Sequence, residues 1–297
     1  MAGEEKTEEE RLKKANEPVR LAMKYHTYYA GKIEVVPKCA IRSVDDFAIW
    51  YTPGVAEPCR EIQKNPDVAF DVTNRWNSVA IVTDGTRVLG LGDIGPIAGL
   101  PVMEGKALIF KYLGGVDAYP ICLDTKNVDD IVNACKWITP SFGGINLEDI
   151  SEPKCFTILD RLRKEATVPV WHDDQQGTAT IVTAGVMNAL KLVGKKMSEV
   201  HVTMMGAGAA NIAISRVLIT AGIDVRKIIM TDSKGVLHPG RKDLQTKFPE
   251  KWDMALRSNA EGKTGDNVEA VKGADLLIAA SRPGPGVVTK DMVRSMA

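Results

Sequence analysis

Short apolar runs alternate along most of this chain with longer segments in which apolar residues recur at helical spacing. Short runs predict β-strands at residues 78–83, 88–91, 118–123 and 168–171. Helical segments are predicted between and after these runs, at residues 106–112, 129–138, 153–164 and 178–193. The N-terminal stretch 7–25 is also predicted to be helical, and Pro18 is expected to kink it or to divide it. Strands and helices that alternate in this way are typical of an α/β fold with a parallel sheet.

After Val200 the pattern becomes that of a dinucleotide-binding unit. An apolar run at 201–205 leads into the turn Gly206-Ala-Gly208 and then into a helix, and a second apolar run ends at Asp232. Strand, glycine turn, helix and strand in this order begin a Rossmann-like parallel sheet. A further apolar run at 274–280 adds a third strand candidate.

The glycine turn has a specific chemical use in such a unit. Gly206 and Gly208 allow backbone amides and a helix N-terminus to approach a pyrophosphate, although an ordinary tight turn would also account for them. Asp232, which follows Gly208 by 24 positions, is placed to accept hydrogen bonds from a ribose 2′-hydroxyl, and its charge favours NAD⁺ over NADP⁺. Ser233 and Lys234 could instead hold a 2′-phosphate. Asn211 occupies the third glycine position and departs from the usual fingerprint.

Two acidic pairs follow strand-like runs at points where a helix is predicted to begin. Glu148-Asp149 comes after the run 143–147, and Asp173-Asp174 comes after the run 168–172. The carboxyl ends of parallel strands open into the ligand crevice of an α/β sheet. Carboxylates that converge there without Cys or His are the ligands that Mg²⁺ or Mn²⁺ requires. The alternative is that each pair only caps a helix, since acidic side chains stabilise helix N-termini.

Composition narrows the class of protein. Basic and acidic residues balance at 38 each among 297 residues, so nothing favours nucleic acid or an anionic membrane as a partner. No apolar run approaches the roughly 18 residues that a membrane span needs. The 5 cysteines lack CxxC spacing, which indicates reduced thiols in a cytoplasmic protein.

Two further residues are candidates for proton transfer. Lys106 follows a glycine-rich stretch and precedes an apolar segment, so it is expected to be partly buried. A buried lysine beside a dication has a lowered pKa and can act as a base, whereas a solvated lysine at a helix start is the alternative. Tyr51 precedes a proline turn, where a packing role competes with a role as an acid.

Taken together, these segments resemble the malic enzyme family, particularly its short prokaryotic form. The matching stretches occur in the family's order, from about residue 15 to the C-terminus: 31–37, 51–56, 89–93, 104–106, 146–150, 172–179 and 206–210. The resemblance implies an N-terminal α/β catalytic domain at 15–172 and a Rossmann-like NAD(P)-binding domain at 173–297.

The resemblance also implies a reaction, the metal-dependent oxidative decarboxylation of L-malate to pyruvate and CO₂ with reduction of NAD(P)⁺. A malolactic-type relative that retains NAD, or an inactive binding relative, is the alternative. The implied metal ligands are Glu148, Asp149 and Asp174. The implied catalytic and substrate-binding residues are Lys106 as base, Asp173 as its partner, Tyr51 as general acid and Arg87 as a ligand of the substrate carboxylate. The implied cofactor-binding residues are Gly206, Gly208, Ala209, Ala210, Asp232 and Thr178.

The same resemblance leads to expectations about assembly and length. Short family members resemble dimers with shared clefts, so a homodimer is expected, with Tyr51 and Lys106 from different subunits as one possibility. The family's nucleotide domain continues with asparagine-bearing segments that are absent after residue 286. The chain is therefore expected to be a fragment of a longer protein, or to have an exposed sheet edge that a partner covers.

Overall fold

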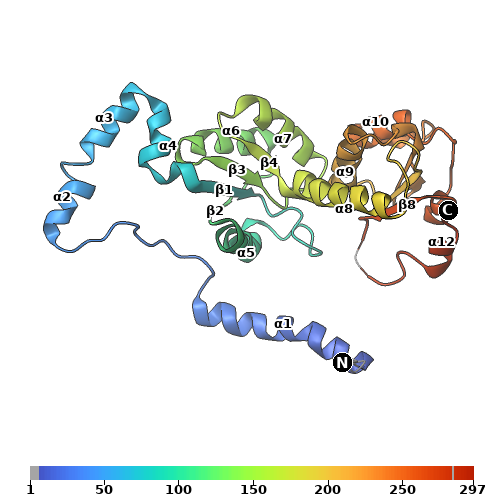
Figure 1. Cartoon of the computed structure of the whole chain (residues 1–297), viewed down its shortest axis with the longest axis horizontal. Helices are drawn as coiled ribbons and strands as arrows, with labels where there is room; N and C mark the ends of the chain where they lie inside the picture. The colour runs from blue at the N-terminus through green and yellow to red at the C-terminus, as the bar shows by residue number, and fades with distance from the viewer. Residues whose placement is uncertain (1–6, 283) are drawn as a thin grey trace.

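Two separate sheets, each covered by helices, form the central and C-terminal parts of the molecule (Figure 1). The computed structural model describes residues 7–282 and 284–297. The first sheet has the order β2-β1-β3-β4 and is parallel, with strands Asp117–Cys122, Ser78–Thr83, Gly144–Leu147 and Val170–His172. The second has the order β7-β6-β5-β8, with strands Gly235–Val236, Ile228–Asp232, Val202–Met205 and Leu276–Ala279. The predicted α/β architecture with a Rossmann-like second sheet is confirmed.

Helices cover both faces of the first sheet because its central strand is apolar on both sides. On β1, Ile81 joins a buried cluster with Met103 of α5, while the adjacent Val82 joins the main core with Ile131 of α6 and Ile158 of α7. Successive side chains of a strand point to opposite faces, so this strand requires helices on both. The covering helices are α5 (Pro96–Gly114), α6 (Val128–Ile138) and α7 (Lys154–Glu165), and α8 (Thr178–Leu192) is the next helix along the chain.

The main core is continuous between the two sheets. Val82 of the first sheet, Val186 of α8 and Met230 of the second sheet belong to one buried cluster. The helix α8 lies between the two sheets in Figure 1. The helices of the second part are α9 (Ala209–Thr220), α10 (Pro249–Arg257), α11 (Asn267–Val271) and α12 (Lys290–Arg294). A shared core of this kind fixes the two parts relative to one another and leaves a cleft along the strand ends.

The N-terminal segment forms an arm that extends away from the sheets (Figure 1). Its helices are α1 (Glu8–Tyr29), α2 (Phe47–Trp50), α3 (Ala56–Lys64) and α4 (Ala69–Val72). Large apolar side chains are exposed along it, among them Val19, Met23, Tyr28, Tyr29, Val35, Val36, Phe47, Ile49 and Trp50. The arm contacts the body through Lys32, whose backbone N–H donates to Glu104 Oε2 at 3.1 Å and whose Nζ donates to the Pro101 carbonyl at 2.8 Å.

Short helical turns connect the main elements. Turns of 3₁₀ helix lie at Val44–Asp46, Pro66–Val68, Asn74–Asn77, Thr139–Ser141, Val225–Lys227 and Lys242–Leu244, and one π-helical turn lies at Asp173–Gly177. Within the part of the chain that the structure describes, no helix combines the length and apolar composition that a bilayer crossing requires.

Three predicted elements differ from the structure. The run 88–91 is not a strand, because Val88 N–H donates to the Gly92 carbonyl at 2.9 Å and closes a tight loop. The helix expected at 106–112 begins earlier, at Pro96, a residue whose fixed φ suits a first helical turn. Of the two effects expected of Pro18, division of the N-terminal helix does not occur, because one helix runs from Glu8 to Tyr29 with Pro18 inside it.

Candidate active site

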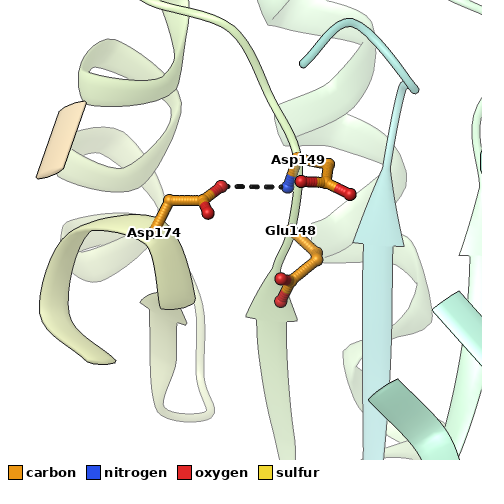
Figure 2. Close-up of side chains that lie close together, drawn as sticks. All are labelled: Glu148, Asp149 and Asp174. Atoms are coloured by element: carbon orange, nitrogen blue, oxygen red, sulfur yellow. Dashed lines mark hydrogen bonds between the residues drawn. The ribbon is translucent and has the colours of Figure 1, made fainter. Parts of the chain in front are cut away.

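Three carboxylates converge at the carboxyl ends of β3 and β4. Glu148 and Asp149 follow β3, and Asp174 lies in the turn that follows β4. The two strands pair in parallel, with Leu147 opposite His172, so the residues after them are neighbours. One carboxylate oxygen from each of the three residues lies within 4.8 Å of the other two (Figure 2).

The backbone around this cluster is arranged to bring the acids together. Asp149 has a φ of 54°, the left-handed region that non-glycine residues seldom adopt. Its backbone N–H donates to Asp174 Oδ2 at 3.2 Å (Figure 2). Its own Oδ2 is buried and has no hydrogen-bond partner in the described structure. Three carboxylates, one of which has an oxygen without a hydrogen-bond partner, are a set of oxygen ligands that fits a hard divalent cation such as Mg²⁺ or Mn²⁺.

Burial, together with the neighbouring negative charges, raises the pKa values of two of these carboxyl groups. Burial raises the pKa of Glu148 to about 7, although the neighbouring Lys106 charge opposes this rise. Burial and the charge of Asp174 raise the pKa of Asp149 to about 6. A site that holds protons this tightly loses them when a cation binds, so cation binding here would depend on pH.

Lys106 lies directly beside the cluster. Its Nζ is 3.2 Å from Glu148 Oε1 and donates to Asp173 Oδ2 at 2.7 Å. Burial lowers the pKa of the Lys106 ammonium, but the hydrogen bond to Asp173 and the Glu148 charge outweigh it and hold the pKa above its usual value. The prediction that Lys106 is partly buried is confirmed. The prediction that its pKa is lowered is not met in the metal-free site, and a lower pKa would require the nearby negative charge to be neutralised.

A π-helical turn gives Asp173 its position. The turn spans Asp173–Gly177, and a Cβ atom added to Gly177 would lie 2.3 Å from Asp173 Oδ1. Any larger residue at 177 would therefore displace the carboxylate that contacts Lys106. Sequence reasoning did not single out Gly177, although its place directly after Asp-Asp-Gln-Gln was a usable signal.

The cluster opens into a cleft of about 1040 Å³ between the two sheets. The cleft is also lined by Arg87, by the glycine turn with Ala209 and Ala210, and by Asp232. Asn211 ties this turn to the strand, because its Nδ2 donates to the carbonyls of Met205 at 2.9 Å and Gly206 at 2.7 Å. The departure from the third glycine thus has a structural reason.

Two expected site residues lie elsewhere in the chain. Thr178 begins α8 and is not among the residues that line the cleft. Tyr51 directly follows α2 in the N-terminal arm and is 71% exposed, and α2 lies well away from both sheets in Figure 1. Within one chain, Tyr51 is not brought to the carboxylate cluster.

Asp232 has a partner that the sequence did not reveal. The Arg241 guanidinium donates to Asp232 Oδ1 at 3.0 Å and to Oδ2 at 2.9 Å. It also donates to Asp243, which in turn contacts Lys234 Nζ at 3.0 Å. The expected ribose acceptor is therefore partly neutralised, with two basic side chains close to it.

A buried network joins the Arg87 loop to the carboxylate loop. Asp84, whose side chain is fully buried, accepts hydrogen bonds from the Thr86 hydroxyl at 2.6 Å and from Lys154 Nζ. The Thr86 hydroxyl accepts from Ser151 N–H at 3.0 Å, and Arg87 N–H donates to the Asp149 carbonyl at 2.9 Å. This network fixes the loop that carries Glu148 and Asp149, and sequence reasoning had assigned Asp84 and Lys154 no part in it.

Comparison with known proteins matches both parts of the chain. Residues 30–163 match the family described as "Malic enzyme, N-terminal domain", and residues 175–297 match "Malic enzyme, NAD binding domain". A bifunctional malic/malolactic enzyme of Bacillus subtilis is 49% identical over 93% of this chain and 66% of its own length. An NADP-dependent malic enzyme of Haemophilus influenzae is 43% identical over 93% of this chain and 36% of its own. The chain thus spans about two thirds or less of the length of these curated relatives.

Solved structures agree with the sequence comparisons. The malic enzyme of Entamoeba histolytica superposes with a TM-score of 0.93 at 46% identity and covers 99% of this chain, which spans 62% of it. The NAD-dependent malic enzyme of Thermotoga maritima has a TM-score of 0.87 at 42% identity, with 93% of this chain and 72% of that one covered. The two matched domains and these relatives show that this chain belongs to the malic enzyme family.

Proposed function

We propose that this protein catalyses the oxidative decarboxylation of L-malate to pyruvate and CO₂, with reduction of NAD⁺ or NADP⁺. The observation that carries the proposal is one cleft in which three carboxylates face a dinucleotide-binding turn, with Lys106 3.2 Å from one of these carboxylates, Glu148. Malate and NAD(P)⁺ give pyruvate, CO₂ and NAD(P)H without a net proton, so each proton that a side chain takes up must be returned.

Glu148, Asp149 and Asp174 would hold the divalent cation, Mg²⁺ or Mn²⁺. When bound, that cation supplies Lewis-acid polarisation of the malate oxygens, and the nicotinamide ring accepts the hydride from C2. Arg87, exposed in the cleft, would pair with a substrate carboxylate.

Lys106 Nζ would accept the proton of the malate hydroxyl. It can do so only in its neutral form, and the carboxylate charge that now raises its pKa is the charge that a dication would offset. Asp173, which accepts a hydrogen bond from Lys106 at 2.7 Å, would orient the amine and exchange protons with it. The geometry supports both proposed roles, because Lys106 Nζ lies within hydrogen-bond distance of Asp173 and of the proposed cation ligand Glu148.

A proton must also reach C3 after CO₂ has left, and Tyr51 would donate it as the general acid. Because Tyr51 is exposed on the arm, a second copy of the chain in a homodimer would have to bring it to the cleft. The exposed apolar residues of the arm support such an interface. The 5 cysteines are all free, which supports a reducing compartment, the cytoplasm.

The cofactor would bind across the glycine turn, with pyrophosphate at the N-terminus of α9. Asp232 would accept from a ribose 2′-hydroxyl, which favours NAD⁺. Since Arg241 neutralises part of the Asp232 charge, discrimination against NADP⁺ would be weak. Thr178, the first residue of α8, would contact the cofactor although it does not line the cleft.

A spectrophotometric assay of nicotinamide reduction tests the proposal. It would combine the purified protein, L-malate, Mn²⁺ and NAD⁺ or NADP⁺, with pyruvate and lactate measured at the end point. Stoichiometric NAD(P)H and pyruvate, abolished by EDTA, are expected. Lactate without accumulation of NADH would favour the malolactic-type reaction instead, and no product from folded protein that binds Mn²⁺ would contradict both.

A further inference from the structure

A salt bridge crosses the cleft between the two parts of the chain. Glu152 follows the carboxylate loop of the first sheet, and Lys251 lies on α10 beside the second sheet. Lys251 Nζ donates to Glu152 Oε1 at 3.1 Å, and both side chains line the cleft. The Phe248 ring centre lies 4.3 Å from the same ammonium, and the Lys251 side chain is only 13% exposed. This lysine is therefore held in one place rather than free in solvent.

The other oxygen of Glu152 lies against the dinucleotide-binding turn. Glu152 Oε2 is buried and has no hydrogen-bond partner among the described residues. It lies 3.8 Å from the point where a Cβ atom on Gly208 would be. Gly208 directly precedes α9, a helix of 12 residues whose first amides have no partner within the helix. A phosphate group that binds at these amides would come close to a carboxylate.

Two like charges so close together would oppose binding unless a cation stands between them. Of the described side chains, Lys251 is the one whose cation contacts Glu152. We propose that Lys251 is a phosphate-binding residue for the dinucleotide, and that Glu152 holds its ammonium in position beside the glycine turn. Bound phosphate and Glu152 share this ammonium, so Lys251 both attracts the dinucleotide and offsets the repulsion from Glu152.

This assignment rests on the proposed use of a dinucleotide, and it predicts opposite effects for the two partners. Lys251→Met removes the shared cation and leaves Glu152 unpaired beside the phosphates. Glu152→Gln removes the repulsion but keeps the cation. If the salt bridge only held the two domains together, both substitutions would weaken ADP-ribose binding.

The test is calorimetric titration of the metal-free protein with ADP-ribose and with adenosine, which lacks phosphate. Lys251→Met should weaken ADP-ribose binding by about tenfold to hundredfold and leave adenosine binding unchanged. Glu152→Gln should tighten ADP-ribose binding by about threefold, and the double variant should recover part of the loss. Lys251→Arg keeps the positive charge and should bind ADP-ribose with an affinity within about threefold of wild type. It serves as the second variant if Lys251→Met does not fold. Lys242→Met, which removes a cation that does not line the cleft, is the matched control.

Unchanged ADP-ribose affinity in Lys251→Met would overturn this assignment and leave the proposed function standing. Equal losses of affinity for ADP-ribose and adenosine, or similar losses of ADP-ribose affinity in both single variants, would also overturn it and would favour a purely structural salt bridge. If the wild-type protein bound no ADP-ribose at all, the proposed function itself would fail.

Discussion

The substitution Glu148→Gln should stabilise the metal-free protein while removing a cation ligand. Burial raises the pKa of Glu148 from 4.5 to about 7, so the folded protein holds a proton there that the unfolded chain releases. Between these two pKa values the folded state binds more protons, and the free energy of unfolding therefore falls as pH rises. At pH 8, ionisation of the buried Glu148 carboxyl lowers the free energy of unfolding by about 3 kcal/mol, and at pH 5 by less than about 1 kcal/mol. Glutamine resembles the protonated acid and should remove this cost.

Urea denaturation in EDTA at pH 5 and pH 8 measures the effect. Glu148→Gln should unfold at higher urea than wild type at pH 8, and the difference should nearly vanish at pH 5. Glu34→Gln, a change at an exposed glutamate of the arm, is the matched control and should shift neither curve. A Glu148→Gln variant that is no more stable at pH 8, or whose gain is independent of pH, would refute the inference that burial of the ionised Glu148 carboxylate destabilises the metal-free protein.

Three further predictions concern the base, the buried network and the cofactor. Lys106→Ala should abolish malate oxidation in the nicotinamide assay yet retain Mn²⁺ binding by calorimetry, and retained turnover would remove its role as base. Lys154→Met leaves the buried carboxylate of Asp84 unpaired and should cost about 3 kcal/mol of unfolding free energy in urea, with most of it recovered in Asp84→Asn/Lys154→Met; equal instability of the double variant would count against the pair. Asp232→Ala frees the neighbouring guanidinium for a 2′-phosphate and should tighten NADP⁺ binding by about tenfold relative to NAD⁺ in fluorescence titrations, whereas an unaltered ratio would exclude the ribose contact.

Sequence patterns predicted the elements that carry the site because those elements are continuous apolar segments. The strand at Ser78–Thr83 was predicted at its observed residues, since it is buried on both faces and reads as one apolar run. The run at 88–91 was read wrongly as a strand, because a short apolar segment has no periodicity that separates a strand from a tight loop. The convergence of the acidic pairs could be expected from the parallel order of the strands alone.

Interactions between distant residues were beyond the reach of these patterns. Glu152 and Lys251 are separated by 99 positions, and neither stands in a motif that would suggest their contact. The pairing of Asp232 with Arg241 depends on a loop geometry that spacing does not fix. The position of Tyr51 likewise depends on how the arm leaves the body, which no local pattern encodes.

The account depends most on the cation site, and titration of the metal-free protein with Mn²⁺, followed by electron paramagnetic resonance, tests it directly. We expect one bound Mn²⁺ per chain, with affinity that falls as pH drops through 7 and 6, because Glu148 and Asp149 then take up protons. Asp174→Ala should lose at least about tenfold in affinity, since it removes one of three ligands. No bound Mn²⁺, or equal affinity in Asp174→Ala, would contradict the central claim that these three carboxylates form the metal centre.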